Sequence, residues 1–508
     1  MASEIPTTSK DHPGLADLLQ VLGPSGRRDR TRAVFANRSL RMDLIEVVGF
    51  DMDYTLAMYR KEAIEQLATG ATIDNLIARG YPDSLRTIEY DSEFVIRGLV
   101  VDKRHGNLFK MDKHRHVRRA FHGFEPLDKE ARRRVYRSET IRLSASRYHL
   151  IDTLFGLPEA YLYAAIVDRF ERNGRGAPDY PRIFKDIRQS IDQAHRDGAM
   201  KATILADVPH YIVSDPGLAL TLHKLRSAGK RLFLLTNSYY PYTDALMSHL
   251  FDGVLPEYPA WRNYFDLVGV GATKPEFFSE KAPFLLVDRS TGKGGAQAHG
   301  PLERGKVYQG GNHAQLQRSL GADPDRVLYV GDHIYGDVLR SKKTSAWRTA
   351  MIVQEMREEL EVEERMGQLL KRLVRLEARR MEVDEATSQD QTVLRALQRV
   401  FEGGLDRYGP SEQQALAEAH SRARAALESD RKTLRQVLED HSSVTAEVDN
   451  AYNRFWGPLF KEGVEHSVFG GQVEDYACLY TSHVSNFLQY SPTRYYRAPR
   501  DRMPHECY

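Results

Sequence analysis

Three short apolar segments that lie far apart in the chain give the first indication of its fold. They are IEVVGF at 45–50, RLFLLTN at 231–237 and RVLYVGD at 326–332. Each is rich in β-branched or aromatic residues and ends in polar or small ones, which is typical of strands buried on both faces of a parallel sheet. Helix-like stretches such as 157–173 and 216–230 lie between them. This alternation predicts an α/β fold with a parallel, Rossmann-like core.

The length of the chain, 508 residues, exceeds the usual size of one hydrophobic core, so we expect several domains. The interval between the first two segments is too long for a single crossover and predicts an inserted domain. The organisation we expect is a poorly ordered arm at 1–30, the first part of the core at 31–60, an inserted cap at 61–204, the second part of the core at 205–353, a helical hairpin at 354–450 and a C-terminal segment packing on the core at 451–508.

Polar helical patterns on both sides of a break at 403–411 predict that the hairpin is antiparallel. Arg380 falls at a seam position and there are few clean heptads, which argues against a long free coiled coil. We therefore expect the hairpin to pack on the body of the protein or on a neighbouring subunit. The residues expected along its seam are Val362, Met366, Leu369, Leu373 and Leu376 in the first helix and Leu427, Leu434 and Leu438 in the second.

The composition argues against several classes of protein. Lysine and arginine number 72 and aspartate and glutamate 70, and this near balance argues against a broad nucleic-acid surface. Only two cysteines occur, Cys478 and Cys507, so a disulfide scaffold is excluded and a reducing cytoplasm is the simplest setting. The N-terminus lacks a signal-peptide pattern, and no apolar run approaches the ~18 residues of a membrane span. We expect a cytoplasmic protein without nucleic-acid or membrane partners.

Polar residues follow the predicted strands. The carboxyl ends of parallel strands meet at one edge of a sheet, so these residues are expected to converge there. Carboxylates can hold Mg²⁺, a lysine and a hydroxyl can bind phosphate oxygens, and an aspartate can attack phosphorus. The pattern therefore indicates phosphoryl transfer. The residues concerned are Asp51 and Asp53 after the first strand, Thr236 and Asn237 after the second, Asp332 and then Asp337 after the third, and Lys274 between the last two strands.

These motifs, DMDYTLA, LLTNS, TKP and GDHIYGD, resemble the four motifs of the haloacid dehalogenase superfamily. Longer stretches resemble the cytosolic purine 5′-nucleotidase family. They are NRSLRMDLIEVVGFDMDYTLAMY, YDSEFVIRGLVVDKRHGNL, TLFGLPEAYL, GPLERGKVYQGG, GDHIYGDVLRSKK and MPHE, and the resemblance covers roughly residues 33–353 and 450–506.

The resemblance implies a Mg²⁺-dependent phosphatase. It makes Asp51 the nucleophile and a metal ligand, and Asp53 the general acid and base whose backbone carbonyl also binds the metal. Asp332 is the third protein ligand of Mg²⁺. The resemblance further implies that Thr236 and Asn237 bind phosphate oxygens, that Lys274 balances the charge of nucleophile and phosphate, and that Asp337 orients Lys274 or a metal-bound water.

The same resemblance implies that residues of the inserted cap recognise the substrate. Arg188 and Asp192 match residues that bind the six-position carbonyl side of a purine, and the helical spacing places both on one face with His195. His195 and Lys201 match further substrate positions, and Phe155 matches the aromatic that stacks on the base. Gly156 and Arg196 depart from the asparagine and tyrosine common in the family. The residues that align with an effector region of some relatives are Arg142, Asp152, Tyr335 and Lys343.

The function expected from these residues is hydrolysis of inosine or guanosine monophosphate through an aspartyl-phosphate, with transfer to a nucleoside as an accompanying activity. Relatives of this size imply a homo-oligomer, a dimer or a tetramer. Two alternatives stay open at this stage. One is a phosphatase of the same superfamily that acts on another small phosphomonoester, such as a sugar or lipid phosphate. The other is an inactive scaffold whose helical hairpin binds a partner.

Overall fold

The computed structural model describes residues 29–172, 178–279, 281–339 and 345–499. Its centre is a ten-stranded sheet. The pairings from β18 through β13 are parallel, and antiparallel strands close both edges. The order across the sheet is β1 (Phe35–Ala36), β18 (Leu479–Thr481), β15 (Arg348–Ile352), β14 (Val327–Gly331), β3 (Val47–Phe50), β9 (Arg231–Leu235), β10 (Leu267–Val270), β13 (Val307–Gly310), β11 (Phe284–Asp288) and β12 (Lys293–Gln297).

The three apolar segments of the sequence form β3, β9 and β14, which lie side by side in the middle of this sheet. Every residue of β3 and β14 is buried, as expected for strands covered by helices on both faces. The predicted parallel α/β core is therefore confirmed. The core helices are α8 (Pro216–Ser227), α9 (Tyr240–Phe251), α10 (His313–Leu320) and α15 (Val468–Tyr476), and a π-helical turn, η7, follows β14 at Ile334–Leu339.

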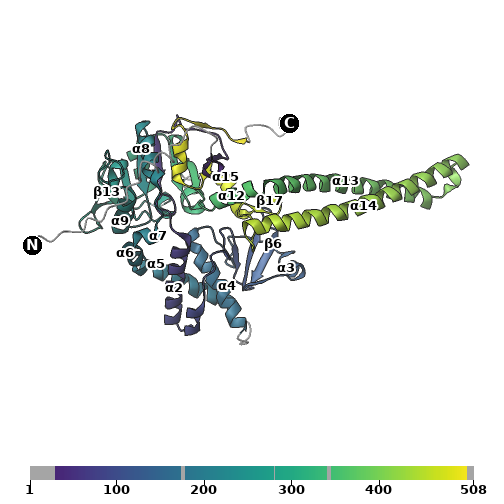
Figure 1. Ribbon diagram of the computed structural model, residues 1–508, viewed down its shortest axis with the longest axis horizontal. Coiled ribbons are helices and arrows are strands. Elements are labelled where there is room, and N and C mark those ends of the chain that lie inside the picture. The colour runs from purple at the N-terminus through teal and green to yellow at the C-terminus, as the bar shows by residue number, and fades with distance from the viewer. Residues whose placement is uncertain (1–28, 173–177, 280, 340–344, 500–508) are drawn as a thin grey trace, which may run out of the picture. The chain divides into compact units, whose positions relative to one another are not determined.

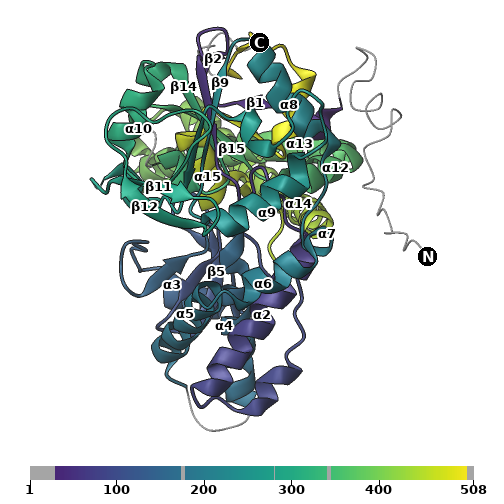
Figure 2. The same ribbon diagram turned by 90° about the vertical axis from the view of Figure 1, so that its left-hand side faces the viewer.

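The inserted cap has a sheet of its own, antiparallel and five-stranded. Its strands, in sheet order, are β7 (Glu125–Pro126), β6 (Val117–His122), β5 (Asn107–Met111), β4 (Val100–Asp102) and β8 (Tyr148–Leu150). The helices α2, α4 and α5 pack together beside it (Figure 2). The cap helices are α2 (Lys61–Ala78), α3 (Lys129–Tyr136), α4 (Leu157–Arg172), α5 (Tyr180–Arg196), α6 (Ala199–Ala206) and α7 (Val208–Tyr211).

Two chain segments join cap and core, and they run next to each other. Tyr59 on the outgoing segment forms an isolated antiparallel β-bridge with Ile212 on the returning one. The Val213 N–H donates to the Met58 carbonyl at 2.8 Å. The returning segment then starts α8 at Pro216. These contacts join the first residues of the cap to its last residues, at a point only a few residues after Asp53 in the sequence.

Residues Glu359–Pro458 form a second compact unit. Within it α13 (Gly367–Glu402) and α14 (Pro410–Tyr452) pack against each other along their length, as an antiparallel hairpin (Figure 1). α12 (Met356–Arg365) precedes them. His441 of α14 lies 3.2 Å from Glu377 of α13, and Arg380 pairs with the same glutamate at 2.7 Å. The predicted hairpin is therefore present, and a seam arginine is accommodated by an ion pair.

The predicted seam is wrong at one position in α14. Leu438 is 45% exposed, whereas Val437, Val444 and Val448 are buried. Val437 lies seven residues before Val444, so it keeps the helical period of the seam and the neighbouring leucine turns outward.

Three parts of the sequence predictions fall outside the described residues: nearly all of the arm at 1–30, Lys343 of the effector region, and the end of the C-terminal segment at 500–508, which contains the MPHE stretch. Among the described residues, no helix combines the length and apolarity needed to cross a bilayer.

Candidate active site

Four neighbouring strands carry the predicted catalytic residues at their carboxyl ends. Asp332 follows β14, Asp51 follows β3, Thr236 follows β9, and Lys274 comes shortly after β10. These strands are adjacent in the order β14–β3–β9–β10. The tertiary structure thus brings together residues that are up to 281 positions apart in the sequence, at the sheet edge where ligands of open α/β folds bind.

Lys274 is the cation at the centre of the site. Its Nζ lies 2.6 Å from Oδ1 of Asp337, 3.0 Å from Oδ1 of Asp51 and 2.9 Å from the Tyr329 hydroxyl. Burial alone would lower the pKa of Lys274, but Asp337 and Asp51 raise it well above its usual range. The lysine therefore stays positively charged, and its charge stabilises carboxylates that burial would otherwise protonate.

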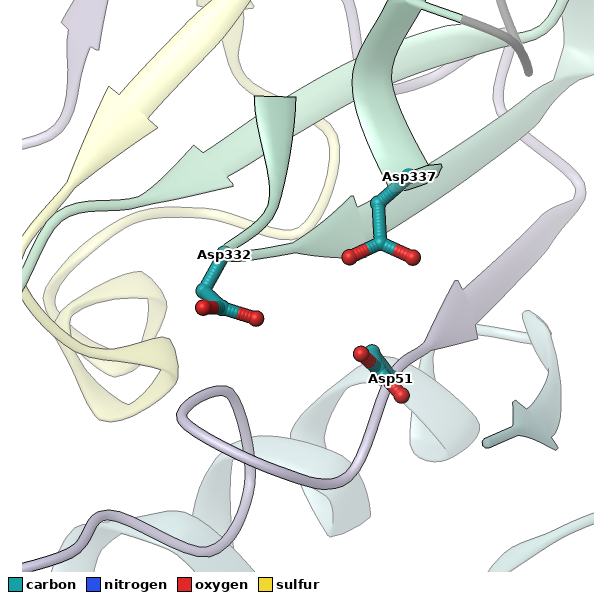
Figure 3. Close-up of side chains that lie close together, drawn as sticks. All are labelled: Asp51, Asp332 and Asp337. Atoms are coloured by element: carbon teal, nitrogen blue, oxygen red, sulfur yellow. The ribbon is translucent and has the colours of Figure 1, made fainter. Parts of the chain in front are cut away.

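Three buried carboxylates form a cluster: Asp51, Asp332 and Asp337 (Figure 3). Each contributes an oxygen, and these oxygens all lie within 4.8 Å of one another. Burial raises the pKa of Asp51 well above its usual range, with Lys274 opposing the shift and the other carboxylates adding to it. Burial likewise raises the pKa of Asp332 to about 7, and Asp337 adds to that shift.

This cluster fits a divalent cation. Three aspartates and one lysine leave two negative charges, which one divalent ion balances. All the ligand atoms are oxygens, which hard cations such as Mg²⁺ prefer. The resemblance assigns Asp337 to the surroundings of the metal, whereas the structure places its carboxylate within the cluster beside Asp51 and Asp332. Asp337 thus has two partners available, the lysine and the cation.

Gly331 explains how Asp337 comes so close to the strand end. A Cβ atom at position 331 would lie only 2.6 Å from the Asp337 Cβ, so no larger residue fits there. The His333 N–H also donates to Oδ2 of Asp337 at 3.2 Å. The turn after β14 is therefore folded around this carboxylate.

Asp53 lies apart from the cluster and is held by two hydroxyl groups. Tyr59 donates to its Oδ1 at 2.6 Å and Ser238 donates to its Oδ2 at 2.8 Å. Burial raises the pKa of Tyr59 well above its usual range, with Asp53 adding to the shift, so Tyr59 remains a protonated donor. Tyr242 in turn lies 2.8 Å from the Tyr59 hydroxyl. These partners fix the carboxylate in one orientation.

Thr236 and Asn237 begin the loop after β9. Thr236 is fully buried, and its hydroxyl accepts from the Ser238 N–H at 3.0 Å. Asn237 is exposed, and its side-chain amide accepts from the Lys274 N–H at 2.6 Å and donates to the Lys274 carbonyl at 3.0 Å. The predicted phosphate-binding asparagine therefore also positions the lysine loop.

Comparison with known protein families agrees with the interpretation of these motifs. The family model described as "5′ nucleotidase family" matches residues 34–508. The chain belongs to the 5′-nucleotidase family. The predicted resemblance is confirmed at this level, and the family and site together identify a phosphoric monoester hydrolase.

Several relatives are named for this domain. A 5′-nucleotidase domain-containing protein of Dictyostelium discoideum is 29% identical over 93% of this chain and 74% of its own length. 5′-Nucleotidase domain-containing protein 2 is 32% identical over 65% of this chain in both Rattus norvegicus and Homo sapiens, and these matches span 60% and 64% of the relatives, less than two thirds of each. Among solved structures, CbbY from Rhodobacter sphaeroides in complex with phosphate aligns with a TM-score of 0.24 and 18% identity, over 61% of this chain and 86% of CbbY.

Arg97 of this 5′-nucleotidase-family chain is a site residue that the sequence did not single out. Although it belongs to the cap and is 1% exposed, it donates to the backbone carbonyl of Asp332 at 3.1 Å. It also forms two hydrogen bonds with Glu355 of the core, at 2.7 and 2.6 Å. The only sequence signal was its place inside a family-like stretch, DSEFVIRG. Arg97 joins the cap to the loop that carries a predicted metal ligand.

Phe155 lies against the loop that follows β3, and its stacking on a base stays a prediction. Its ring centroid is 4.7 Å from that of Tyr54, 6.0 Å from that of Tyr59 and 5.7 Å from that of His195. The Lys201 Nζ lies 5.0 Å from the centre of the Tyr242 ring, so it too is near the tyrosines that support Asp53. The structure therefore brings the cap residues Phe155, His195 and Lys201 to the side of the site where Asp53 lies.

Arg188 and Asp192 lie on the same face of α5, one turn apart. Arg188 donates to the buried carboxylate of Glu159 at 2.7 Å. The Asp192 Oδ1 lies 3.7 Å from Nε of Arg188. Both side chains of the α5 pair are about half exposed, 47% for Arg188 and 50% for Asp192. Glu159 was not predicted, and it anchors the guanidinium while leaving much of it accessible. Of the two positions that differ from the common family residues, Arg196 is exposed and Gly156 is buried.

The effector region is described in part. Asp152 lies 3.5 Å from Nε2 of His333, next to the metal-site loop. Burial alone would lower the pKa of His333, but Asp152 raises it, so the two groups form an ion pair. Arg142 is exposed, and Tyr335 is 39% exposed. The structure gives Asp152 a structural partner, and effector binding at these residues stays a prediction.

Proposed function

We propose that this chain is a Mg²⁺-dependent 5′-nucleotidase that hydrolyses purine nucleoside 5′-monophosphates with a 6-oxo base, inosine or guanosine monophosphate. One observation carries the reaction: Asp51, Lys274 and Asp332 converge at the carboxyl ends of β3, β10 and β14, within one run of four strands. The base preference is supported by the resemblance of the cap residues and by the contacts of Phe155 with Tyr59 and His195. The cytoplasmic setting and the homo-oligomer stay predictions from the sequence.

Asp51 acts as the nucleophile in this proposal. Its Oδ1 already accepts from the Met52 N–H at 2.7 Å and contacts Lys274 at 3.0 Å. Oδ2 is then the oxygen that bonds to phosphorus and forms the aspartyl-phosphate. Lys274 stabilises the negative charge that develops on the phosphoryl oxygens. The carboxylates of Asp51, Asp332 and Asp337 would hold Mg²⁺, which when bound screens the repulsion between nucleophile and phosphate.

Asp53 transfers the proton. It protonates the leaving 5′-oxygen as the phosphorus–oxygen bond breaks, and it then removes a proton from the water that hydrolyses the aspartyl-phosphate. Tyr59 and Ser238 orient its two oxygens, one each. Because a nucleoside 5′-hydroxyl can replace that water, transfer of the phosphoryl group to a nucleoside accompanies hydrolysis.

In this proposal, residues of the cap recognise the base. Phe155 stacks on the purine, a contact worth about 1–3 kcal/mol per base in other proteins. Arg188, anchored by Glu159, donates to the six-position carbonyl, and Asp192 accepts from the ring N–H beside it. A base lacking this donor and acceptor pattern leaves these polar groups unpaired, which disfavours it.

A substrate screen in the presence of Mg²⁺ tests the proposal. The panel is inosine, guanosine, adenosine and uridine monophosphates, a sugar phosphate and p-nitrophenyl phosphate, each with wild type, Asp51→Asn and the exposed control Asp325→Asn. We expect the two 6-oxopurine nucleotides to be hydrolysed fastest, Asp51→Asn to lose nearly all activity, and Asp325→Asn to retain it. A preference for the sugar phosphate supports the alternative phosphatase, and no turnover of any substrate supports the scaffold. Wild-type activity in Asp51→Asn refutes the assigned nucleophile.

A further inference from the structure

A cavity of about 300 Å³ lies in the core unit, and its lining includes none of the predicted catalytic or metal-binding residues. Four segments line it: the N-terminal residues of the described chain, the start of α8, the start of α12, and the turn η9 (Val484–Gln489) with the residues just before it. The residues that decide its chemistry are Arg32, Asp215, Arg357, Ser482, His483 and Ser485. Nothing in the proposed nucleotidase reaction uses these residues.

The charged groups that line the cavity are two guanidinium groups and one carboxylate. Arg32 and Arg357 both line it, against the single carboxylate of Asp215. That carboxylate accepts from the Gly217 N–H at 3.0 Å, because Asp215 is the N-cap of α8. Burial lowers the pKa of His483. The charge of Asp215 opposes this shift, and the charges of Arg357 and Arg32 add to it.

Hydrogen-bond donors complete the lining. Ser482 and Ser485 are buried and both line the cavity. The Ser482 hydroxyl donates to the Thr31 carbonyl at 3.4 Å, so Ser485 is the hydroxyl that we assign to a ligand. In addition α8 and α12 both begin at the cavity, at Pro216 and Met356, so the positive ends of their dipoles add to the field of the two arginines. Guanidinium and hydroxyl groups arranged in this way are the usual partners of a tetrahedral oxyanion.

We propose that this cavity is an anion site that binds a phosphate group, as inorganic phosphate or as a small phosphate ester, between Arg32 and Arg357. The guanidinium groups bind the phosphate oxygens, and the hydroxyl group of Ser485 donates to a remaining one. This inference does not depend on which nucleotide the active site hydrolyses.

Residues that line the cavity are connected by hydrogen bonds to residues of the active site. Its wall includes Val213–Pro216, the segment that returns from the cap to the core. Val213 donates to Met58, and the preceding Ile212 bridges Tyr59, which holds Asp53. Arg357, which also lines the cavity, follows two residues after Glu355, the partner of Arg97. A phosphate bound here therefore fixes the returning segment of the cap.

Equilibrium binding to the full chain tests the proposal. Inorganic phosphate is titrated calorimetrically in EDTA, so that the carboxylate cluster of the active site, without its cation, repels the anion. We expect one phosphate per chain for wild type, and at least tenfold weaker binding for Arg32→Gln/Arg357→Gln. The matched control Arg133→Gln/Arg134→Gln, which removes two exposed arginines of α3, should bind like wild type. Equal binding by all three proteins, or none by wild type at millimolar phosphate, overturns the proposal.

A second measurement uses unmodified protein and does not depend on the variants folding. Phosphate should protect Arg32 and Arg357 from phenylglyoxal, and should slow hydrogen exchange of the peptide that spans 211–216, while Arg133 and Arg134 stay reactive. Modification of Arg32 and Arg357 at the same rate with and without phosphate contradicts the site. Ribose 5-phosphate titrated in parallel separates the two ligand sources: tighter binding than inorganic phosphate assigns the site to phosphate esters, and weaker binding assigns it to free phosphate.

Discussion

Lys274 donates a 2.6 Å hydrogen bond to Asp337, and both side chains are almost completely buried. The same ammonium group contacts the proposed nucleophile Asp51. A buried charge without its partner is strongly disfavoured, so this lysine supports both the charge state of the site and the stability of the strand ends around it.

Replacing Lys274 by methionine should therefore change two quantities. We expect kcat to fall by about 10²–10³-fold, the usual cost of removing one charge-stabilising donor. In EDTA, the free energy of unfolding should fall by roughly 3–5 kcal/mol, because Asp51 and Asp337 lose their buried partner. Mg²⁺ should recover part of that loss, since the cation can neutralise the same carboxylates. Steady-state kinetics and urea unfolding measure the two effects.

The exposed lysine Lys306, paired with Glu303 on the surface, provides the control. Lys306→Met should leave both kcat and stability close to wild type, because surface ion pairs contribute little. A Lys274→Met enzyme with wild-type kcat would show that the lysine has no part in phosphoryl transfer.

Removal of the metal should abolish activity reversibly. After dialysis against EDTA we expect no turnover, and added Mg²⁺ should restore it, because the carboxylates of Asp51, Asp332 and Asp337 repel one another and Lys274 supplies only one positive charge, between Asp51 and Asp337. Mg²⁺ should also raise the melting temperature of wild type through binding to the folded state, and should raise that of Asp332→Asn much less. Undiminished activity in EDTA would disprove a catalytic metal.

Glu65, in the cap helix α2, should make stability depend on pH. Burial raises the pKa of this carboxyl to about 8 in the folded protein, from about 4.5 in the unfolded chain. Between these values the folded state keeps a proton that the unfolded state has lost, so the free energy of unfolding should fall as pH rises from about 4.5 to about 8 and then level off.

Glu65→Gln should remove this contribution. The variant should gain stability relative to wild type as pH rises through that window, by up to a few kcal/mol, as measured by urea unfolding at a series of pH values. Glu62→Gln, an exposed change on the same helix, should follow the wild-type curve. Parallel curves for wild type and Glu65→Gln would mean that Glu65 is ionised in the folded state.

Arg188→Ala should weaken recognition of the base without affecting the phosphoryl chemistry. We expect KM for inosine monophosphate to rise at least tenfold, since a base-reading hydrogen bond to a charged group is lost, while KM for p-nitrophenyl phosphate changes little. Glu159→Gln should shift KM in the same direction but less, because Arg188 loses its 2.7 Å anchor. Arg182→Ala, on the exposed side of the same helix, serves as the control. An equal rise in KM for both substrates refutes a base-reading role.

Much of the core was predictable because its signals are local. Each of the three apolar segments contains the residues that its strand buries, so β3, β9 and β14 were expected where the structure has them. Aspartates directly after such strands indicate a site at the sheet edge. The hairpin α13–α14 was likewise indicated by helical periodicity, although the burial of Val437 in place of Leu438 depends on how the two helices face each other.

The contacts that position these residues were not predictable, because they join distant parts of the chain. Arg97 and Glu355 are 258 residues apart, and Tyr59, Ser238 and Asp53 meet only when the cap segment folds back beside the loop after β9. By itself, the sequence determined the α/β core, the catalytic residue types and their order on the strands. Only the tertiary structure decided that Asp337 joins the carboxylate cluster, that Glu159 anchors Arg188 and that a cavity lined by two arginines borders the cap linker. The physical reason is that burial and charge balance arise from packing between segments, and a linear pattern carries no information about those distances.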